Sequence, residues 1–465
     1  MAETTLTVPA PGAVPVEQLR ALVEGAVLVP GDAGYEEART VFLGVMDQRP
    51  AAVVQAAALR DVVEVVTLAR DTGLPLAVRS GGHSVFCLVD GGLVLDLSQL
   101  RDLRIDPATR TAWVGAGVTT GEYGVAAAEH GLATGFGDTG SVGVAGITLG
   151  GGIGYLVRKH GLTIDDLLAA EIVTADGAVR RVDATSEPDL FWAVRGGGGN
   201  FGVVTRLRFR LHELPEVTGG PLVLPATPEV ITGFLALAAQ APEELTAIVN
   251  VMKSPPMPFV PAELHGTPIV MATIVYAGVG EEAEAALAPF RQLSTPIADM
   301  VGPMPYPGVF PPEREGFHPV SVARNTFLDR VDAEDAEAIL DRVRSSSAVL
   351  PAVQLRVLGG AMARVPADAT AFPSRDRAIM AQIAAIYADR AEAALHTRWA
   401  DELLVTLQKG VPGVYVNFLS DDTDARIGEA YPEATWARLR AIKRRYDPTN
   451  VFRVNTNIPP ADDEG

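Results

Sequence analysis

The stretch GSVGVAGITLGGGIG, residues 140–154, decides how this chain can fold, because almost half of its residues are glycine. Two related stretches flank it, RSGGHS at 79–84 and RGGGGNFG at 195–202. The 46 glycines gather in these loops and do not recur at a fixed period, which argues against a repeat architecture. Consecutive glycines expose several backbone N–H groups together, a surface that suits phosphate oxygens. Three such loops in one region predict a single long anionic ligand.

The glycine patterns differ from two common nucleotide motifs. GITLGG at 146–151 does not match GxGxxG, and no acidic residue is clearly placed about 20 residues further on. The pattern GxxxxGK[ST] is absent from the chain, which disfavours a P-loop NTPase.

Short strands and helices alternate around the glycine loops. Periodicity predicts helices at 59–73, 120–131 and 187–196, and strands at 74–80, 92–98, 111–118 and 202–214. Residues 169–182 predict a hairpin, with a type I′ turn at Asp176-Gly177.

From Pro215 the pattern changes, because glycine loops stop and long amphipathic helices alternate with strands. Examples are a strand at 245–252 and helices at 281–293 and 332–344. Proline-rich stretches at 253–261 and 301–312 predict loops, and their aromatic residues favour an apolar pocket. The chain closes with a strand predicted at 413–420, a helix at 433–446 and an irregular tail. We expect an α+β protein with domain boundaries near residues 214 and 411.

Charge and cysteine content exclude several function classes. The net charge is −19, from 38 Lys and Arg against 57 Asp and Glu, which would repel nucleic acid and anionic membranes. The short basic run Arg440–Lys443–Arg444–Arg445 lies on a helical pattern and is expected to face solvent. Cys87 is the single cysteine, so no internal disulfide and no cysteine-based metal cluster can form, and no metal is expected. The first 20 residues resemble no signal peptide, and no membrane span is predicted, so we expect a cytoplasmic protein.

RSGGHS, GDTGSVGVAGITLGGGIGYLVRKHGLTIDDL, DLFWAVRGGGGNFGVVT and YDPTNVFRVNTNIPP occur in the order and approximate spacing of a known family. Together they resemble the vanillyl-alcohol-oxidase/PCMH flavoproteins, in particular the berberine-bridge-enzyme-like branch. The resemblance covers most of residues 30–214 and 413–460. It implies a PCMH-type FAD-binding domain made from both ends of the chain, 1–214 and 411–465. Residues 215–410 would form an inserted α/β substrate domain, an antiparallel sheet covered by helices.

The resemblance also implies a covalent bond between a histidine and the flavin 8α-methyl group, and the matching residue is His83. Neutral imidazole, the form available near pH 7, can add to an electrophilic flavin quinone methide. Relatives with a second link have a cysteine where this chain has Thr139, so FAD should be monocovalent. Cys87 lies at a different place in the loop and is expected to be a buried, inert thiol.

The remaining FAD contacts that the resemblance implies fall into four groups. The pyrophosphate would lie on the first loop, and the flavin and ribityl chain on the second. The adenine side would meet backbone groups of the third loop, and the isoalloxazine would face residues 415 and 417, with a polar anchor in the tail. In that order the residues are Arg79, Ser80, Gly81, Gly82, His83 and Ser84; Thr139, Val142, Gly143, Gly146, Gly150, Gly151, Gly152 and Gly154; Asn200, Gly202 and Val204; Tyr415 and Asn417; Asn455 and Asn457.

Several residues are candidates for the catalytic base. Plant relatives use a glutamate on a substrate-domain strand, but the matching strand here offers Gln354 and Arg356. Tyr415 could serve if a cation lowers its pKa, and Asn417 lies two residues further on. His318 and His396 are further candidates, although a lone histidine is more often structural.

The resemblance implies an FAD-dependent oxidase that removes hydride from a small alcohol, amine, phenolic or polyketide-type substrate and passes electrons to O2, giving H2O2. One alternative is a flavin-dependent dehydrogenase or oxygenase that tailors a natural product. Another is a non-catalytic flavin-binding protein, since the strand carboxylate is missing. The substrate, its stereochemistry and the oligomeric state stay open at this point.

Overall fold

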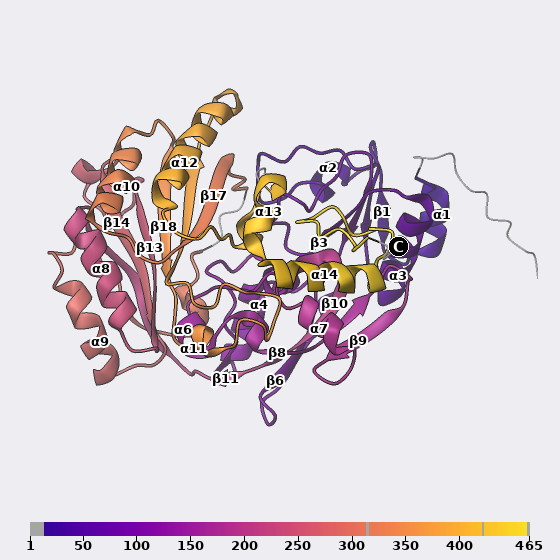
Figure 1. Ribbon diagram of the computed structural model, residues 1–465, viewed down its shortest axis with the longest axis horizontal. Coiled ribbons are helices and arrows are strands. Elements are labelled where there is room, and N and C mark those ends of the chain that lie inside the picture. Colours follow the sequence, from indigo (N-terminus) through magenta and orange to yellow (C-terminus); the bar gives the residue numbers. More distant parts are fainter. Residues whose placement is uncertain (1–13, 313–315, 421–422, 463–465) are drawn as a thin grey trace, which may run out of the picture.

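The computed structural model describes residues 14–312, 316–420 and 423–462. The first 13 residues, part of the segment over which no signal peptide is expected, lie outside that range. The elements form two groups that lie side by side, and both ends of the described chain belong to the same group (Figure 1). This arrangement agrees with the predicted α+β fold.

The first group contains a mixed sheet, an antiparallel sheet and a two-stranded ribbon. In the mixed sheet, ordered β1-β2-β4-β3, the neighbours β2, β4 and β3 are parallel, and β1 pairs antiparallel with β2. The antiparallel sheet has the order β5-β6-β10-β8-β9, and β7 pairs with β11. The bounds are β1 Ala26–Leu28, β2 Ala52–Gln55, β3 Leu76–Arg79, β4 Leu93–Asp96, β5 Leu103–Asp106, β6 Thr111–Gly115, β7 Leu132–Ala133, β8 Leu167–Val173, β9 Val179–Asp183, β10 Val203–Arg210 and β11 His212–Glu213.

Helices of the first group are short, apart from those at 59–72 and 433–446, which carry an apolar stripe. In α3 (Leu59–Thr72), Val62, Val65, Val66 and Ala69 are buried, the spacing of one helical face. The helix ends at Gly73, whose φ of 70° is the left-handed conformation that favours glycine. The others are α1 Val16–Leu22, α2 Tyr35–Ala38, α4 Thr120–Ala128, α5 Val144–Leu149, α6 Val157–His160, α7 Pro188–Ala193, α13 Thr423–Ala430 and α14 Glu433–Tyr446, with 3-10 turns at Thr163–Asp165, Gly198–Asn200 and Val416–Phe418.

The β8–β9 hairpin forms where it is predicted, but its turn is not type I′. That turn needs positive φ at both central residues, and among the two only Gly177, with φ 80°, has it. Gly177 N–H donates to the carbonyl of Thr174, and Thr174 N–H donates to that of Ala178. The Asp176 carboxylate accepts from Thr174 and Ala178, so the aspartate stabilises the turn through its side chain.

The second group is one antiparallel sheet with the order β15-β12-β14-β13-β18-β19-β17, and β16 pairs with β12. Long strands of eight or nine residues make up most of it. Their bounds are β12 Val217–Pro225, β13 Leu245–Lys253, β14 Pro268–Tyr276, β15 Ala298–Asp299, β16 Gly302–Met304, β17 Ser321–Leu328, β18 Leu350–Val357 and β19 Ile379–Ile386.

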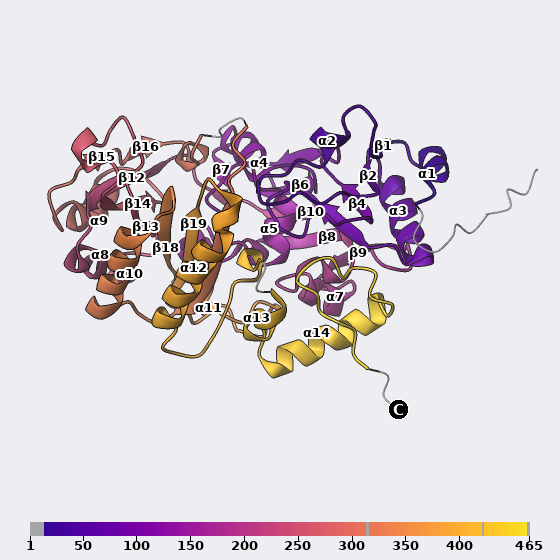
Figure 2. The same cartoon turned by 90° about the horizontal axis from the view of Figure 1, so that it is seen from above.

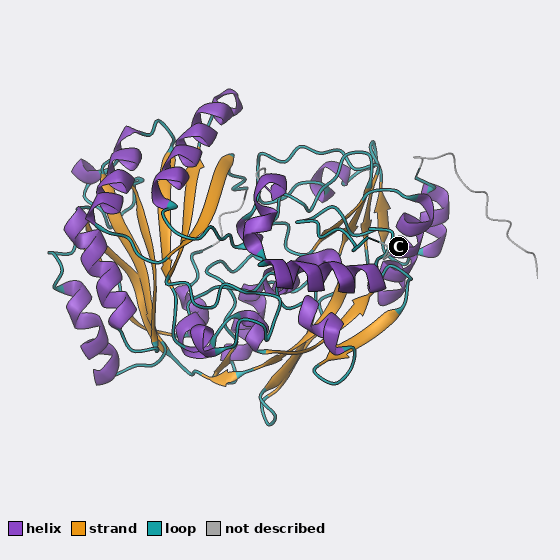
Figure 3. Cartoon of the chain, in the orientation of Figure 1, coloured by secondary structure: helices purple, strands orange, loops and turns teal. Residues whose placement is uncertain are grey.

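Helices cover the face of this sheet that points away from the first group (Figures 1 and 2). Alternate residues such as Val249, Val251, Val353 and Leu355 pack under them in one apolar core. Figure 3 shows the resulting layers, with helices outside and strands inside. The helices are α8 Pro228–Gln240, α9 Glu281–Arg291, α10 Ala333–Ser345 and α12 Ala393–Leu407, with α11 Ala361–Arg364 and 3-10 turns at Ala262–Leu264, Tyr306–Val309 and Arg390–Glu392 elsewhere.

The C-terminal segment packs on the first group through a lysine predicted to face solvent. Lys443 is fully buried, which corrects that prediction for one member of the basic run. Its ammonium lies 2.6 Å from the Asp447 carboxylate and donates to the carbonyls of Asn200 and Phe452. A buried charge needs such partners, so Lys443 holds α14, the tail and the third glycine loop together.

Candidate functional site

The three glycine loops meet at the two ends of α5. A Cβ atom at Gly81 would lie 2.2 Å from the backbone nitrogen of Gly143, so the first two loops cross at a point that only glycine permits. At the other end, Gly196 N–H of the third loop donates to the carbonyl of Leu149. Three segments far apart in sequence therefore form one continuous surface.

The first loop exposes backbone N–H donors, while its charged residue, Arg79, is bound within the fold. The N–H groups of residues 81–84 donate no hydrogen bond to any other residue that the structure describes. The Arg79 guanidinium pairs with the buried Asp96 carboxylate and donates to the Ala38 carbonyl. Ser80 Oγ donates to the Ala116 carbonyl at 2.6 Å. The loop thus offers free N–H groups to an anion, while Arg79 anchors its base.

His83 projects from this loop between an aromatic ring and the second loop. Its ring stacks on Phe42 with centroids 4.2 Å apart, and Nε2 lies 3.1 Å from Ser141 Oγ. Burial lowers the pKa of His83 to about 4, although the hydrogen bond with Ser141 and the charge of Asp138 act in the opposite direction. The imidazole is therefore neutral and nucleophilic across the physiological range.

The second loop contains the residues that were expected to contact the flavin and the ribityl chain. The carbonyls of Thr139 and Val142 accept from the side chain and the N–H of Thr120, which fixes the backbone ahead of α5. No atom lies within 4 Å of where a Cβ of Gly146 would stand, so open space faces the helix there. A Cβ at Gly154 would lie 2.6 Å from the Gly137 carbonyl oxygen, which explains glycine at this position by close packing.

Residues 413–420 do not form the predicted strand; Val416–Phe418 is a 3-10 turn. The turn brings Tyr415 and Asn417 together, because Asn417 Nδ2 donates to Tyr415 Oη at 2.9 Å. Asn417 Nδ2 also lies 2.9 Å from the Ile147 carbonyl, and Tyr415 Oη accepts from Gly152 N–H at 2.9 Å. Both side chains therefore bind the second loop, whose residues were expected to line the flavin.

The neighbours of Tyr415 divide between two cores. Val414 and Val416 pack in the core of the first group, whereas Phe418 packs with Tyr415 in a smaller cluster. Burial raises the pKa of Tyr415, and this outweighs the hydrogen bonds from Asn417 and Gly152 and the charge of Arg356. The condition for a phenolate base, a pKa lowered by a cation, is not met.

The third loop is tied to the tail by Asn200. Its side-chain nitrogen donates to the carbonyls of Gly197 and Thr456, and its oxygen accepts from Ile458 N–H at 2.9 Å. Asn455 and Asn457 lie beside this junction, and the side-chain oxygen of each is buried without a hydrogen-bond partner. The following residues Gly202 and Val204 lead into β10, where Val204 is buried in the core.

A row of amide side chains crosses the face of the eight-stranded sheet opposite the helices. Strand register places its four members directly opposite one another on adjacent strands: Asn250, Gln354, Gln382 and Asn325. Gln354 Nε2 donates to Asn250 Oδ1 at 3.1 Å, and Asn325 Oδ1 accepts from Tyr415 N–H at 2.7 Å. The row therefore links the sheet to the site. Of the four amides, the sequence singled out only Gln354, on the strand where a carboxylate was expected.

Asp138 is a site residue that the sequence did not identify. Its Oδ2 accepts from Arg356 Nη2 at 2.7 Å, so a loop residue of the first group pairs with a sheet residue of the second. Arg356 also donates to the Ile153 carbonyl and to Gln354 Oε1. Pairing between residues 218 positions apart leaves no local pattern in the sequence. A carboxylate therefore lies against Arg356 of the strand at which the sequence offered none.

The two histidine candidates and the cysteine lie in structural roles. His396 is buried on α12, stacked on Tyr387, with Nε2 3.4 Å from Glu392. His318 is exposed, and its Nδ1 lies 2.8 Å from the Val41 carbonyl. Cys87 is 3% exposed, and burial raises the pKa of its thiol to about 11, which matches the expected inert thiol.

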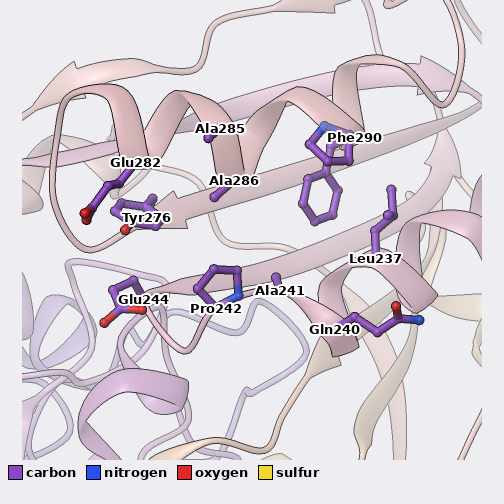
Figure 4. Close-up of a pocket in the computed structure, with 11 residues that line it drawn as sticks. Leu237, Gln240, Ala241, Pro242, Glu244, Tyr276, Glu282, Ala285, Ala286 and Phe290 are labelled. Carbon is purple, nitrogen blue, oxygen red and sulfur yellow. The ribbon is translucent and has the colours of Figure 1, made fainter.

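A surface cavity of about 640 Å³ lies elsewhere, between α8 and α9 in the second group (Figure 4). Glu244, Glu282 and Tyr276 line one end, and Phe290 and Leu237 the other. The residues around His83 take no part in it, so we place the site at the glycine loops. Within the described ranges there is no group of three potential metal ligands, and no described helix combines the length and apolar character needed to span a membrane.

Family models match two separate segments of the chain. Residues 50–183 match the FAD binding domain, and residues 414–459 match the berberine and berberine-like segment. Among curated proteins, the (R)-6-hydroxynicotine oxidase of Paenarthrobacter nicotinovorans is 33% identical over 459 residues, covering 94% of this chain and 97% of that protein. An FAD-linked oxidoreductase of Bacillus subtilis is 31% identical over 457 residues, with 94% and 97% covered.

Solved structures are similar over nearly the whole chain. The crystal structure of 6-hydroxy-D-nicotine oxidase from Arthrobacter nicotinovorans has a TM-score of 0.82 at 30% identity, covering 94% of this chain and 98% of that one. Berberine-bridge-like protein 1 of Physcomitrella patens has a TM-score of 0.85 at 23% identity, with 97% and 100% covered, which shows a shared fold.

Proposed function

Because this chain belongs to the berberine-bridge-enzyme-like family of PCMH-type FAD-linked oxidoreductases, we propose that it is an oxidase of a small organic alcohol, amine, phenolic or polyketide-type compound. When bound, FAD accepts hydride from the substrate at N5, and O2 is proposed to reoxidise it with release of H2O2. The proposed division of labour assigns FAD to residues 1–214 and 411–465 and the substrate to residues 215–410.

The described residues fit FAD at the glycine loops. Free N–H groups at residues 81–84 match the negative charge of a pyrophosphate, as donors at such loops do. The unpartnered side-chain oxygens of Asn455 and Asn457 suit N–H donors of a bound cofactor. The open space before Gly146 leaves room beside α5.

We propose that His83 is the single covalent attachment point. Its Nε2 is engaged with Ser141, while Nδ1 makes no hydrogen bond with a described residue and is free to form the bond. The low pKa keeps the ring neutral, and Nδ1 carries the free lone pair in the tautomer in which Nε2 donates to Ser141 Oγ. Tyr415 and Asn417 are proposed to face the reacting side of the cofactor, where they hold the Gly152 turn and orient the substrate.

One observation carries the oxidase proposal: a neutral histidine, free loop amides and the Tyr415–Asn417 pair converge around α5, beside a polar sheet face. The test mixes the purified holoenzyme without oxygen with phenols, amines and alcohols and follows loss of oxidised-flavin absorbance. Air is then admitted, and H2O2 is measured. Rapid reoxidation with equivalent peroxide supports the oxidase; reduction without reoxidation by air would indicate a dehydrogenase. No reduction by any compound would contradict both.

A further inference from the structure

Among the polar contacts between the two domains, one carboxylate lies directly beside the second glycine loop. Asp138 precedes Thr139 in the second loop, and its side chain is 23% exposed, whereas that of its partner Arg356 is 4% exposed. Arg356 binds only one of the two carboxylate oxygens, Oδ2. Among the residues that the structure describes, the other oxygen, Oδ1, has one long contact, 3.4 Å from Thr139 Oγ1. One oxygen of Asp138 is therefore held while the other stays open.

The groups that face Asp138 come from every element packed around it. Arg356 lies on β18, His83 on the first loop, and Tyr155 and Tyr306 on the segments that border the domain boundary. Tyr306 Oη is buried without a hydrogen-bond partner, while Tyr155 bonds to Thr273 of the sheet. The charge of Asp138 thus acts on His83 of the first loop, on Tyr155 and on Tyr306, and its carboxylate lies where the second loop meets the sheet of the substrate domain.

Resting on the function proposed above, we infer that Asp138 accepts the proton that the substrate loses when its carbon is oxidised. The substrate then has an O–H or N–H beside the reacting C–H. Its C–H bond breaks with both electrons passing as hydride to bound FAD, which is reduced. Its O–H or N–H bond breaks with the electron pair forming C=O or C=N, and the proton moves to Asp138 Oδ1.

Arg356 is the positioning residue for this step. Its guanidinium, 2.7 Å from Oδ2, holds that oxygen by a charge-assisted hydrogen bond and leaves Oδ1 as the acceptor. Its further bonds to the Ile153 carbonyl and Gln354 fix the direction of the free oxygen. The same contact joins the flavin loop to the substrate sheet, so the base is complete only when both domains are docked.

The test measures anaerobic flavin reduction as a function of pH, using the compound that reduces the wild-type holoenzyme fastest. Asp138→Asn should lower the rate about 10²–10⁴-fold, the usual contribution of general base catalysis, and should remove the decline of rate at acid pH. Arg356→Gln should change the pH at which that decline occurs, because the carboxylate loses the group that holds Oδ2. An independent readout is the infrared band of a protonated carboxyl. In the wild type this band should appear with a midpoint at the same pH as the midpoint of the decline in rate, and in Asp138→Asn it should be absent.

The matched control is Asp165→Asn, because Asp165 pairs with buried Arg375 at 2.7 Å with no assigned role in the reaction. It should lower stability and leave the pH profile unchanged. A wild-type rate or a retained acid decline in Asp138→Asn, with flavin content intact, would overturn the inference. If Asp138→Asn does not fold, an unmoved decline in Arg356→Gln overturns it instead. Absence of reduction in the wild type would overturn the proposed function as well.

Discussion

The two cores of this protein are built in opposite ways. The core of the first domain joins residues from 19 to 211 with residues from 414 to 458, and its loops meet at glycines and buried side-chain bonds. The core of the second domain draws on residues 222–407 and follows strand register and helix periodicity. The difference teaches that regular periodicity organises the core of the second domain, while contacts between distant loops organise the first domain, where the cofactor site is proposed.

The largest effect is expected in the first domain, where the cofactor site is proposed. In His83→Ala, covalent flavin should be lost completely, because the only proposed attachment atom is removed. The chain is denatured in acid, and its fluorescence on a gel and its intact mass are recorded. His130→Ala, at an exposed position, is the control and should keep the flavin. Fluorescence that stays on the His83→Ala chain would contradict a single link.

Leu340→Ala tests the contribution of the second domain's core to stability. Leu340 is fully buried on α10 beneath the sheet, so truncation should lower the free energy of unfolding by about 2–5 kcal/mol. Flavin attachment in the folded protein should not change. Val349→Ala, at 68% exposure, should stay within about 0.5 kcal/mol of the wild type in the same denaturant titration. Loss of attachment without loss of stability would break the proposed division between the cores.

Tyr415→Phe tests the junction between the two halves. The variant loses the acceptor for Gly152 N–H and Asn417, and a hydrogen bond worth about 0.5–1.5 kcal/mol corresponds to a fall of up to about tenfold in flavin reduction rate. Tyr35→Phe, which loses a buried bond to the Pro50 carbonyl, is the control. A fall of about 10²–10⁴-fold with an altered pH profile would make Tyr415 the proton acceptor. A change under about threefold would leave it as packing.

Cys87→Ala should show that a residue of the first domain, four positions after His83, contributes to packing and not to flavin attachment. The thiol is buried and hydrogen-bonded to the Ser84 carbonyl, so the variant should keep the covalent mass shift and lose about 1 kcal/mol or less. Peptide mass mapping and thermal unfolding check the two parts. A lost covalent bond in this variant would show that the thiol takes part in attachment.

The smallest expected effect is the absence of a pH response in attachment. An ordinary histidine becomes protonated below about pH 6.5, which would slow nucleophilic attack. The pKa of His83 is about 4, so the rate of flavin attachment to flavin-free chain should stay level from pH 8 down to pH 5 and fall only near pH 4. The rate is measured by covalent fluorescence after mixing with FAD. A decline centred near pH 6.5 would place His83 in solvent during attachment.

The elements with strong periodicity could be predicted, whereas those shaped by distant partners could not. The helices at 59–73 and 433–446 form almost where the sequence places them. The predicted strand at 413–420 is a 3-10 turn, because Tyr415 and Asn417 bind the second glycine loop and Asn325. Lys443 was expected in solvent, and its burial depends on carbonyls of residues 200 and 452, which no helical pattern reveals.

The sequence by itself determined the family, because the motifs that carry it are local in the chain, and the resemblance implied both the helix-covered antiparallel sheet and the proposed FAD-binding loops. Only the tertiary structure decided what those parts do together. It placed Arg79 on Asp96, raised the pKa of Tyr415, aligned four amides across the sheet and paired Asp138 with Arg356. The physical reason is that charge, pKa and hydrogen bonding depend on neighbours in space, and here those neighbours come from opposite ends of the chain and from different domains.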